Sequence, residues 1–472
     1  MTVELLIFNI LWLNMASISW IFTLNSWQEG ESRALKLGLF SSILATLGAA
    51  VLLNYSFAGL LNKFSWAWVV LDLILLTGIL LMSAPWEKNK GAFRGCENYI
   101  EGSVKNFDER DTVFSRYRSL KAGSTQYKEY YSRHPELEEM DAERRKEFND
   151  RGNTKKIIDD KNKTNRVFAR SSERLSWYLG KEEVVVPQPS EEKTEISPLE
   201  MAEKIKGYAR HLGADLVGIT RLDPRWVYSH TGDIHYDNWD DWGKAITLEH
   251  DYAIVVATEV NRDMVVTSPH TPASVEMNSK YALGSFIAVQ VANFLAGMGY
   301  SARAHHFRNY MVNCVPIAVE AGLGELGRNG YLITKEFGPR VRISIITTNA
   351  LLKTDQPIDL GVQHFCEVCK KCARLCPSKS ISLGEKTVDN GIRRWNVQPE
   401  GCHMFWAKIG TGCSICMGTC PWSHPNTLIH RISKWMAIRS PVARIVLTWL
   451  DDVVYGSYQK SKVPAWVDYS EK

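Results

Sequence analysis

The sequence lacks a strong charge of one sign, and this absence narrows the classes of protein to consider. Its 472 residues carry 56 Lys and Arg against 52 Asp and Glu, a net charge of +4 at pH 7. A surplus this small does not predict a nucleic-acid-binding protein. The hydrophobic share of 45% and aromatic share of 11% exclude a disordered chain. At roughly 150 residues per domain, the length predicts about three folded units.

Cysteine is almost absent outside one short region. Of ten cysteines, only Cys96 and Cys314 lie outside residues 366–420. No G-x-G-x-x-G follows a predicted strand, so a Rossmann dinucleotide site is not supported. A twin-Arg pair and a basic stretch before the first apolar run are also missing. We therefore expect neither a signal for exporting a folded protein nor a cleaved leader.

Three long apolar runs occupy the amino-terminal region, at residues 3–24, 37–57 and 65–84. Each has about the ~20 residues that a helix needs to cross a hydrocarbon core. The buried helices of a soluble bundle would carry a polar stripe, whereas these runs are apolar nearly all round. The sequence therefore predicts three transmembrane helices in contact with membrane lipid.

The basic residues around these runs predict the orientation of the chain. The first loop contains Arg33 and Lys36, the second contains Lys63, and the third run is followed by Lys88, Lys90 and Arg94. The positive-inside rule then places the amino terminus outside and the residues after 85 in the cytoplasm. We therefore expect a multi-pass protein of the cell membrane with its larger part on the cytoplasmic face.

Glu29 and Glu31 form an acidic pair in the first loop. One interpretation is an ordinary solvated loop. The other is a proton-accepting site for quinol oxidation at the membrane surface.

The rest of the chain divides by composition into a polar connector, a mixed domain and a cysteine-rich domain. Helices are predicted at Met201–Leu212 and Tyr281–Gly299, and strands at Asp215–Ile219, Ala253–Ala257 and Ile343–Thr347. This alternation indicates an α/β or α+β domain with a central sheet. The predicted domains are a membrane anchor at 1–87, a connector wrapping the core at 88–195, the mixed domain at 196–355, the cysteine-rich domain at 356–430 and a C-terminal extension at 431–472.

Eight cysteines form two runs that each close in C-x2-C-x3-C-P. The first run is Cys366, Cys369, Cys372 and Cys376, and the second is Cys402, Cys413, Cys416 and Cys420. In ferredoxins the last cysteine of each run binds the other run's cluster. This rule assigns Cys366, Cys369, Cys372 and Cys420 to one [4Fe–4S] cluster, and Cys376, Cys402, Cys413 and Cys416 to the other.

Zinc and disulfides are the competing interpretations of these cysteines. Zinc sites use two C-x2-C pairs or Cys with His, and disulfides are disfavoured in a reducing cytoplasm. The spacing therefore predicts two [4Fe–4S] clusters in a ferredoxin-like domain. A different metal signal is weaker: Asp233-Ile-His235 begins like the corrinoid motif Asp-x-His-x-x-Gly, but Asn238 stands in place of the glycine.

Three segments together resemble the catalytic subunit of the reductive dehalogenases. They are Leu212–Ile219 with Leu222–Tyr228, Ala321–Arg328 with Phe337–Arg342, and the two cysteine runs. The resemblance covers roughly residues 100–430. The amino-terminal part, with Ser26, Glu29, Glu31 and Ala34, is similar to the small membrane-anchor subunit that usually accompanies that catalytic subunit as a separate chain.

The resemblance implies a corrinoid (a base-off cobalamin) in the mixed domain, which would receive electrons from the two clusters. It implies that Tyr281 donates a proton, that Arg342 stabilises the resulting phenolate, and that Asn309 lines the same pocket. A nearby cation makes a phenol a better acid. Glu325 and Arg328 would bind the corrinoid, or else stabilise their own turn. Gly322 and Gly324 would allow close backbone approach.

The function that follows is a membrane-attached enzyme that replaces halogen by hydrogen on an organohalide. Its electrons would come from a quinol such as menaquinol or from another reduced carrier, and a homodimer is one predicted assembly. One alternative is an epoxyqueuosine-reductase-like enzyme, which would have Arg-Asp-Tyr-His where this chain has Ser279-Lys280-Tyr281-Ala282. The other alternative is an electron-transfer subunit without catalytic activity.

Overall fold

The computed structural model describes residues 3–57, 65–84, 89–149, 163–234, 239–456 and 463–468. Its contacts divide the chain into two compact units. The first unit comprises residues 1–88, 360–369 and 424–462, and the second comprises 89–359, 370–423 and 463–472. Lys63 and Lys88, which entered the orientation argument, lie outside the described residues.

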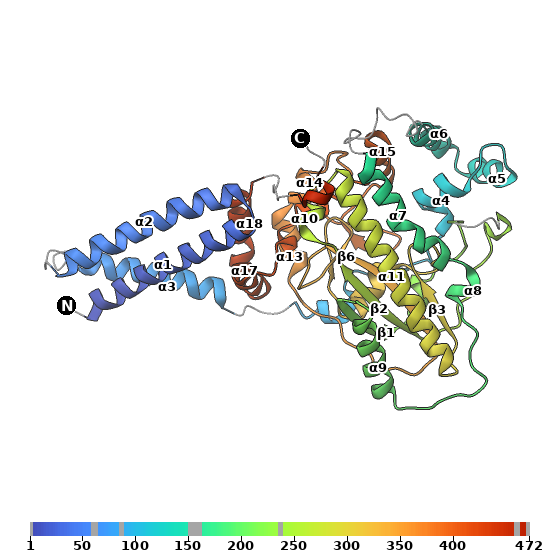
Figure 1. The fold of residues 1–472 in the computed structure, drawn as a ribbon, viewed down its shortest axis with the longest axis horizontal. Coiled ribbons are helices and arrows are strands. Elements are labelled where there is room, and N and C mark those ends of the chain that lie inside the picture. The colour runs from blue at the N-terminus through green and yellow to red at the C-terminus, as the bar shows by residue number, and fades with distance from the viewer. Residues whose placement is uncertain are drawn as a thin grey trace. The chain divides into compact units, whose positions relative to one another are not determined.

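The first unit is helical (Figure 1). Its helices are α1 (Val3–Gln28), α2 (Ser32–Phe57), α3 (Ser65–Ser83), α13 (Val362–Cys369), α17 (Leu428–Arg439) and α18 (Pro441–Val454). Helix α1 packs along α2 and also contacts α3, while α17 and α18 contact each other and α3. The predicted C-terminal extension therefore packs with the predicted anchor, because α18 also contacts α2 and α13.

Helices α1 and α2 are joined by hydroxyl groups within an apolar hairpin. Ser19 lies 2.7 Å from Ser41, Thr23 lies 2.9 Å from Ser42, and the indole of Trp20 donates to Thr46. The outer faces carry exposed apolar side chains, including Ile18, Leu24, Phe40, Leu44 and Leu47. Small and hydroxyl residues at a helix interface, with apolar residues outside, are typical of helices packed in lipid.

Three transmembrane helices are not confirmed. Among the described residues, one helical stretch, Ser32–Val51 of α2, is long and apolar enough to cross a membrane by length and composition. The other two spans stay predictions.

The second unit is built on a four-stranded antiparallel sheet with the order β1-β2-β6-β3. The strands are β1 (Leu216–Arg221), β2 (Tyr252–Glu259), β3 (Ala302–His305) and β6 (Val341–Thr348). The predicted strands are present, and their antiparallel pairing makes the domain α+β. The central strands β2 and β6 are almost entirely buried, which agrees with their runs of apolar residues.

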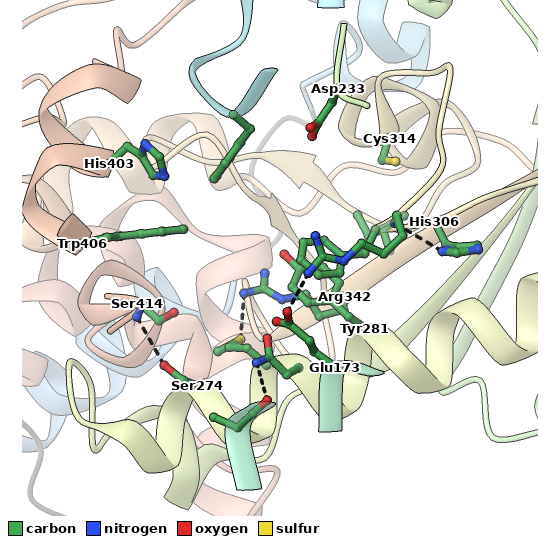
Figure 2. Close-up of a pocket in the computed structure, with 18 of the residues that line it drawn as sticks. Glu173, Asp233, Ser274, Tyr281, His306, Cys314, Arg342, His403, Trp406 and Ser414 are labelled. Carbon is green, nitrogen blue, oxygen red and sulfur yellow. Dashed lines mark hydrogen bonds and ion pairs between the residues drawn. The ribbon is translucent and has the colours of Figure 1, made fainter. Parts of the chain in front are cut away.

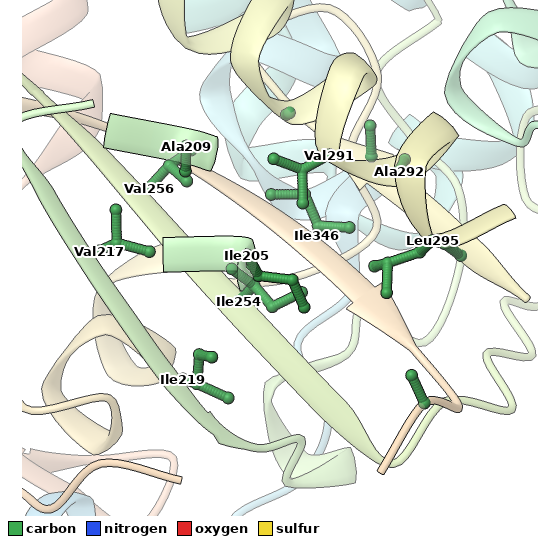
Figure 3. Packing of buried hydrophobic residues seen from close by; sticks show 14 of the residues in the cluster. Ile205, Ala209, Val217, Ile219, Ile254, Val256, Val291, Ala292, Leu295 and Ile346 are labelled. Atoms are coloured by element: carbon green, nitrogen blue, oxygen red, sulfur yellow. The ribbon is translucent and has the colours of Figure 1, made fainter. Parts of the chain in front are cut away.

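Helices cover both faces of this sheet. On one face, α9 (Pro198–His211) and α11 (Thr271–Gly297) bury Ile205 and Leu295 against Ile254 and Ile346 (Figure 3). On the other face, α12 (Cys314–Glu320) packs against alternate residues of the same strands, such as Val255. Side chains alternate across a strand, so β2 serves two hydrophobic cores.

Helix α11 begins ten residues earlier than the sequence suggests. It starts at Thr271, with Pro272 in its first turn, and a buried stretch of it precedes the predicted start at Tyr281. Proline is favoured in the first turn because that turn has no internal hydrogen bond to lose. Tyr281 therefore lies within the helix rather than at its start.

The predicted connector belongs to the second unit and contains helices of its own. They are α4 (Val113–Ser119), α5 (Thr125–Arg133), α6 (Pro135–Asn149), α7 (Lys163–Leu179) and α8 (Glu182–Val185). The buried Arg116 donates to Asp141 at 2.8 Å and so joins α4 to α6. Helix α7 packs along α11. Three of these helices, α4, α6 and α7, also line the cavity described below.

The packing of the hydrophobic core predicts how one substitution changes the free energy of unfolding. Ile254→Ala removes a fully buried side chain from the middle of β2, and we expect a loss of about 2–5 kcal/mol in the free energy of unfolding. Chemical denaturation followed by circular dichroism measures it. Leu199→Ala in α9, where Leu199 is 56% exposed, is the control and should change the free energy by less than about 0.5 kcal/mol. Equal effects of the two variants would contradict the assigned core.

Candidate active site

A cavity of about 680 Å³ lies within the second unit. Its walls come from α4, α7, α11, β6, the segment after β3, and α15 (Pro399–Ile409). Figure 2 shows His403 and Trp406 on one side of the cavity and Tyr281 and Arg342 on the other. These residues are far apart in the sequence, so the fold alone brings them together.

One wall is a row of stacked aromatic rings and arginine guanidinium groups. The rings of Tyr281 and Phe307 are 4.1 Å apart and nearly parallel, at 13°. The guanidinium of Arg342 lies 4.8 Å from the Tyr281 ring. The guanidinium of Arg308 lies 4.2 Å from the Phe307 ring and 4.0 Å from the Trp177 ring. The negative face of an aromatic ring attracts a cation, so each arginine holds the ring beside it.

Tyr281 and Arg342 are thus adjacent and both line the cavity, as the resemblance implies. Arg342 also donates to the sulfur of Met277 at 2.7 Å. Among the residues that the structure describes, no carboxylate pairs with Arg342. Its positive charge is therefore available to a negative charge on the tyrosine or on a ligand. Their catalytic roles stay predictions.

Asn309 does not line the cavity, in contrast to the prediction. Its side chain is buried, donates to the carbonyl of Gly180 at 3.0 Å, and accepts from Arg303 at 2.7 Å. The cause is a tight turn in which the backbones of His306 and Asn309 pair with each other. This turn directs the neighbouring residues Phe307, Arg308 and Tyr310 into the cavity instead.

The glycine-rich turn also lies away from the large cavity. Glu325 is in the short hairpin of β4 (Glu325–Leu326) and β5 (Leu332–Ile333), and a side chain at Gly324 would meet the carbonyl oxygen of Ile333 at 2.3 Å. Gly322 has φ of +72° and would meet the carbonyl oxygen of Gln356 at 2.2 Å. Both glycines thus permit close backbone approach, as expected from the sequence.

Arg328 is buried and stabilises its own region. It donates to the carbonyl oxygens of Ser382 and Gly384 and lies 4.6 Å from the Trp395 ring. Beside it is a second cavity of about 250 Å³, which Gly327, Gly330 and Trp395 line. The two cavities adjoin, since Val315 lines both. Neither Glu325 nor Arg328 lines either cavity, so corrinoid binding by them stays a prediction.

Sequence reasoning missed an acidic group in the cavity wall. Asp233 accepts from Arg118 at 2.8 Å and from the Tyr310 hydroxyl at 3.4 Å. Burial and the nearby Asp233 raise the pKa of Glu109 to about 8. Burial raises the pKa of the Tyr310 phenol well above its usual value. The only signal was the incomplete motif at Asp233, of which His235 and Asn238 lie outside the described residues.

The adjacent residues His305, which ends β3, and His306, which follows it, face different surroundings. The His305 ring nitrogen Nε2 lies 2.9 Å from the Thr347 hydroxyl in the sheet, while His306 contacts Ser285 and lines the cavity. Only one of the two lines the cavity, because side chains alternate along an extended chain.

The four cysteines of the second predicted cluster lie together in the second unit. The thiol of Cys416 interacts electrostatically with those of Cys376, Cys402 and Cys413, and also with that of Cys372 from the first predicted cluster. Burial raises the pKa of Cys402 to about 12 and that of Cys413 to about 11, each helped by neighbouring thiols. Such crowded thiols become stable thiolates only beside a cation, so this donor set fits an iron–sulfur cluster.

The two cysteine runs share a local backbone. Helix α14 (Lys371–Arg374) begins after Lys370, and α16 (Ile415–Gly418) begins after Ser414. Both preceding residues adopt positive φ, 52° and 86°, at the same place within C-x2-C. Helix α14 contacts α16. Of the first predicted cluster, Cys372 and Cys420 lie in the second unit and Cys366 and Cys369 in the first.

The acidic pair of the first loop is buried, so the solvated-loop interpretation is wrong. The Glu29 side chain is 6% exposed and Glu31 is 3% exposed. Glu29 accepts from Thr427 at 3.1 Å and lies 3.3 Å from the imidazole of His430, within the first unit. The C-terminal helices thus cover the acidic loop.

His430 belongs to a larger buried group in the same unit. Its ring stacks on His424, with centroids 4.4 Å apart and an angle of 2°. His424 pairs with Asp451 at 2.6 Å, and the Tyr455 hydroxyl lies 3.2 Å from His430. These residues lie about 400 positions from Glu29 in the chain, so no local sequence pattern connects them with it.

Comparison with known proteins confirms the resemblance. Residues 365–424 match the family model of the 4Fe-4S dicluster domain. The tetrachloroethene reductive dehalogenase of Sulfurospirillum multivorans is 32% identical over 299 residues, 57% of this chain and 59% of that protein.

Solved structures agree in fold. The catabolic reductive dehalogenase NpRdhA, in complex with 3-bromo-4-hydroxybenzoic acid, is 26% identical with a TM-score of 0.60, over 78% of this chain and 50% of that chain. A further reductive dehalogenase structure, described as suggesting a mechanism for B12-dependent dehalogenation, is 25% identical with a TM-score of 0.59 over the same shares. The chain spans about half the length of these relatives, and in sequence and fold it is similar to reductive dehalogenases.

The cysteine assignment predicts a change in metal content. Cys402→Ser should reduce the iron of anaerobically prepared protein from about eight to about four atoms per chain, because one of two [4Fe–4S] clusters loses a ligand. Iron analysis and electron paramagnetic resonance (EPR) of the reduced protein measure this. Cys96→Ser, at a buried cysteine outside the two runs, should keep about eight. An unchanged iron content in Cys402→Ser would remove that residue from the ligand set.

Proposed function

We propose that this chain is a corrinoid-dependent reductive dehalogenase, which replaces the halogen of an organohalide by hydrogen. The observation that carries the proposal is the pairing of Tyr281 with Arg342 inside a cavity, in a chain that also has a 4Fe-4S dicluster domain. The clusters would supply the electrons, and Tyr281 would supply the proton that the product carbon needs.

The residues present fit a corrinoid. Val315 lines both the large and the small cavity, and together these cavities would hold the ring and its appended groups. Asp233, Ser274 and Tyr310 line the large cavity and would hold the amide side chains through hydrogen bonds. When bound, the corrinoid supplies the reduced cobalt that breaks the carbon–halogen bond.

The chain's own residues supply the proton and the environment. Tyr281 holds the proton on its hydroxyl oxygen, and proton transfer leaves a phenolate. Arg342 lies over the same ring at 4.8 Å and offsets that negative charge. Phe307 keeps the tyrosine in place by stacking. In total, the reaction consumes two electrons and one proton. Hydrogen takes the place of the halogen on carbon, and the halogen leaves as halide.

This mechanism predicts the effect of one substitution. Tyr281→Phe keeps the ring stack but removes the proton donor, so turnover of a halogenated substrate should fall by about 10²–10⁴-fold. Anaerobic assays with the holoenzyme measure turnover, and corrinoid and iron contents should stay at the wild-type level. Tyr208→Phe, outside the cavity on α9, is the control. A protein that holds its iron but has no affinity for a corrinoid contradicts the proposed function itself.

The first unit would serve as a membrane anchor. Its support is the apolar exposed surface of α1 and α2 and the hydroxyl contacts between them. We propose three spanning helices, with the rest of the chain on the cytoplasmic face as the loop charges predict. A homodimer stays a prediction.

The buried group around Glu29 would accept protons from a membrane quinol such as menaquinol. Oxidation of a quinol releases two electrons and two protons, so the site needs bases beside a route for electrons. Glu29 and His430 are the bases. Helix α18, which carries Asp451, packs on α13, which carries Cys366 and Cys369. The protons would thus pass to Glu29 and His430, and the electrons toward Cys366 and Cys369, all within the first unit.

This donor site predicts a selective loss. In Glu29→Gln, the ratio of quinol-driven to dye-driven dehalogenation should fall at least about tenfold, since the amide cannot accept a proton. Both rates are measured on membrane-embedded protein, with reduced methyl viologen as the dye. Glu200→Gln, at an exposed position of α9, should leave the ratio unchanged. A ratio unaffected by Glu29→Gln would remove the acidic loop from quinol oxidation.

The structure does not favour the epoxyqueuosine-reductase-like alternative. Lys280, at the position where that family would have an aspartic acid, lies 3.8 Å from Glu276 on the same helix and does not line the cavity. The second alternative, a non-catalytic electron-transfer subunit, gives no reason for a cavity that contains Tyr281 and Arg342.

A further inference from the structure

The two C-terminal helices of the first unit, α17 and α18, each expose an apolar stripe. The residues of each stripe are three or four positions apart, so they share one face of their helix. Their exposed fractions lie between 38% and 63%. They are Leu428, Ile432 and Trp435 on α17, and Ile445, Trp449 and Val453 on α18. Contiguous apolar surface of this kind marks an interaction site.

The other faces of the two helices pack within the first unit. Helix α17 contacts α1 and α3, and α18 contacts α2, α3 and α13. His430 and Ala437 of α17 are buried, and so are Ala443 and Asp451 of α18. The stripes are therefore the outer faces of a helix pair that the rest of the unit holds in place.

Hydrogen bonds attach this pair to one end of the apolar hairpin. Glu29, between α1 and α2, accepts from Thr427, the residue before α17, at 3.1 Å. Arg33, in the first turn of α2, donates to the carbonyl of Val453 at 3.1 Å. Ser440, between α17 and α18, donates to a carbonyl in the last turn of α3 at 2.7 Å. Helix α1 ends, α2 begins and α3 ends here, so α17 and α18 lie at this end of the hairpin (Figure 1).

The charges and aromatic rings of the pair suit the surface of a membrane. Helix α17 contains Arg431, Lys434 and Arg439 and no acidic residue. The guanidinium of Arg439 lies 4.8 Å from the ring of Trp435. Tryptophan is enriched where lipid meets water, and amphipathic helices with cations beside an apolar face lie in that layer. A second copy of the chain would present the same cations to α17, whereas anionic lipid headgroups would offset them.

We propose that α17 and α18 lie in the headgroup layer of the membrane, with both apolar stripes toward the acyl chains and Arg431 toward lipid phosphates. The inference rests on the membrane anchor proposed above, and it adds the C-terminal extension to the parts of the chain that meet lipid. The inner face of α17 carries His430, which lies 3.3 Å from Glu29. This arrangement holds the proposed proton-accepting pair at the level of the headgroups, within reach of a lipid-soluble quinol.

The test uses the full chain, anaerobically, in vesicles of phosphatidylcholine and anionic phosphatidylglycerol. A fluorescent amino acid replaces Trp449, and its emission is quenched either by lipids brominated on their acyl chains or by iodide in the water. The same probe at Leu199 of α9, which is 56% exposed, is the control for a surface in water. The ratio of lipid quenching to iodide quenching should be at least about threefold higher at position 449 than at position 199, because an interfacial helix buries its apolar face among the acyl chains.

Substitutions in the pair give a second readout with the probe kept at position 449. Ile445→Asp places a carboxylate on the stripe and should lower the quenching ratio at least about threefold, since a charge opposes burial in lipid. Ile445→Leu is the matched control and should keep the ratio. Ile445 is 53% exposed, so both variants should retain the wild-type iron content. The ratio should also rise with phosphatidylglycerol content, and Arg431→Gln should weaken that dependence.

A probe at Phe40 of α2, which is 69% exposed, separates this inference from the anchor on which it rests. Lipid quenching at position 40 together with iodide quenching at position 449 overturns this inference alone. Iodide quenching at both positions overturns the proposed anchor and the inference with it. A probe at position 449 that neither quencher reaches would assign the stripe to a protein contact, such as a second copy of the chain, and would also overturn the inference.

Discussion

The site depends on the contact between two guanidinium groups and the rings that they flank. Arg342 and Arg308 lie at the two ends of the Tyr281–Phe307 pair, and Trp177 closes the row beyond Arg308. Burial lowers the pKa of Arg308 to about 10, because it removes the charge from water. The ring faces and Glu173 compensate that loss of hydration. The residues of this row come from α7, α11, β6 and the segment after β3. Because they contact one another, displacing one of these residues would displace its neighbours in the row.

The hydrophobic core positions this row. Arg342 lies in β6 opposite Thr258 of β2, so the pairing register of these two buried strands fixes the position of Arg342 along the sheet. Tyr281 lies on α11, whose buried residues Ile287 and Val291 pack on the sheet. Tyr281 and Arg342 are thus carried by elements whose buried residues pack in the core.

Much of this architecture was predictable, and the failures have physical causes. Cysteine spacing identified the clusters because ligand geometry constrains it directly, and apolar periodicity located the strands. Asn309 was assigned wrongly because a tight turn rotates it out of the wall and presents Arg308 instead. The burial of Glu29 and its contact with His430 depend on packing between segments about 400 residues apart, which no local pattern reports.

The matching conformations of Lys370 and Ser414 have a consequence for sequence variation. Each residue follows a predicted ligand cysteine and adopts positive φ, 52° and 86°, so the backbone turns before the next ligand. Residues with a Cβ adopt this conformation at a cost, and a branched side chain adopts it least readily. Glycine and asparagine should therefore be accepted at these two positions, whereas valine and isoleucine should be rejected. The dicluster region thus limits its own divergence at two positions that bind no iron, and the C-x2-C-x3-C-P spacing that the two runs share is matched by these backbone angles.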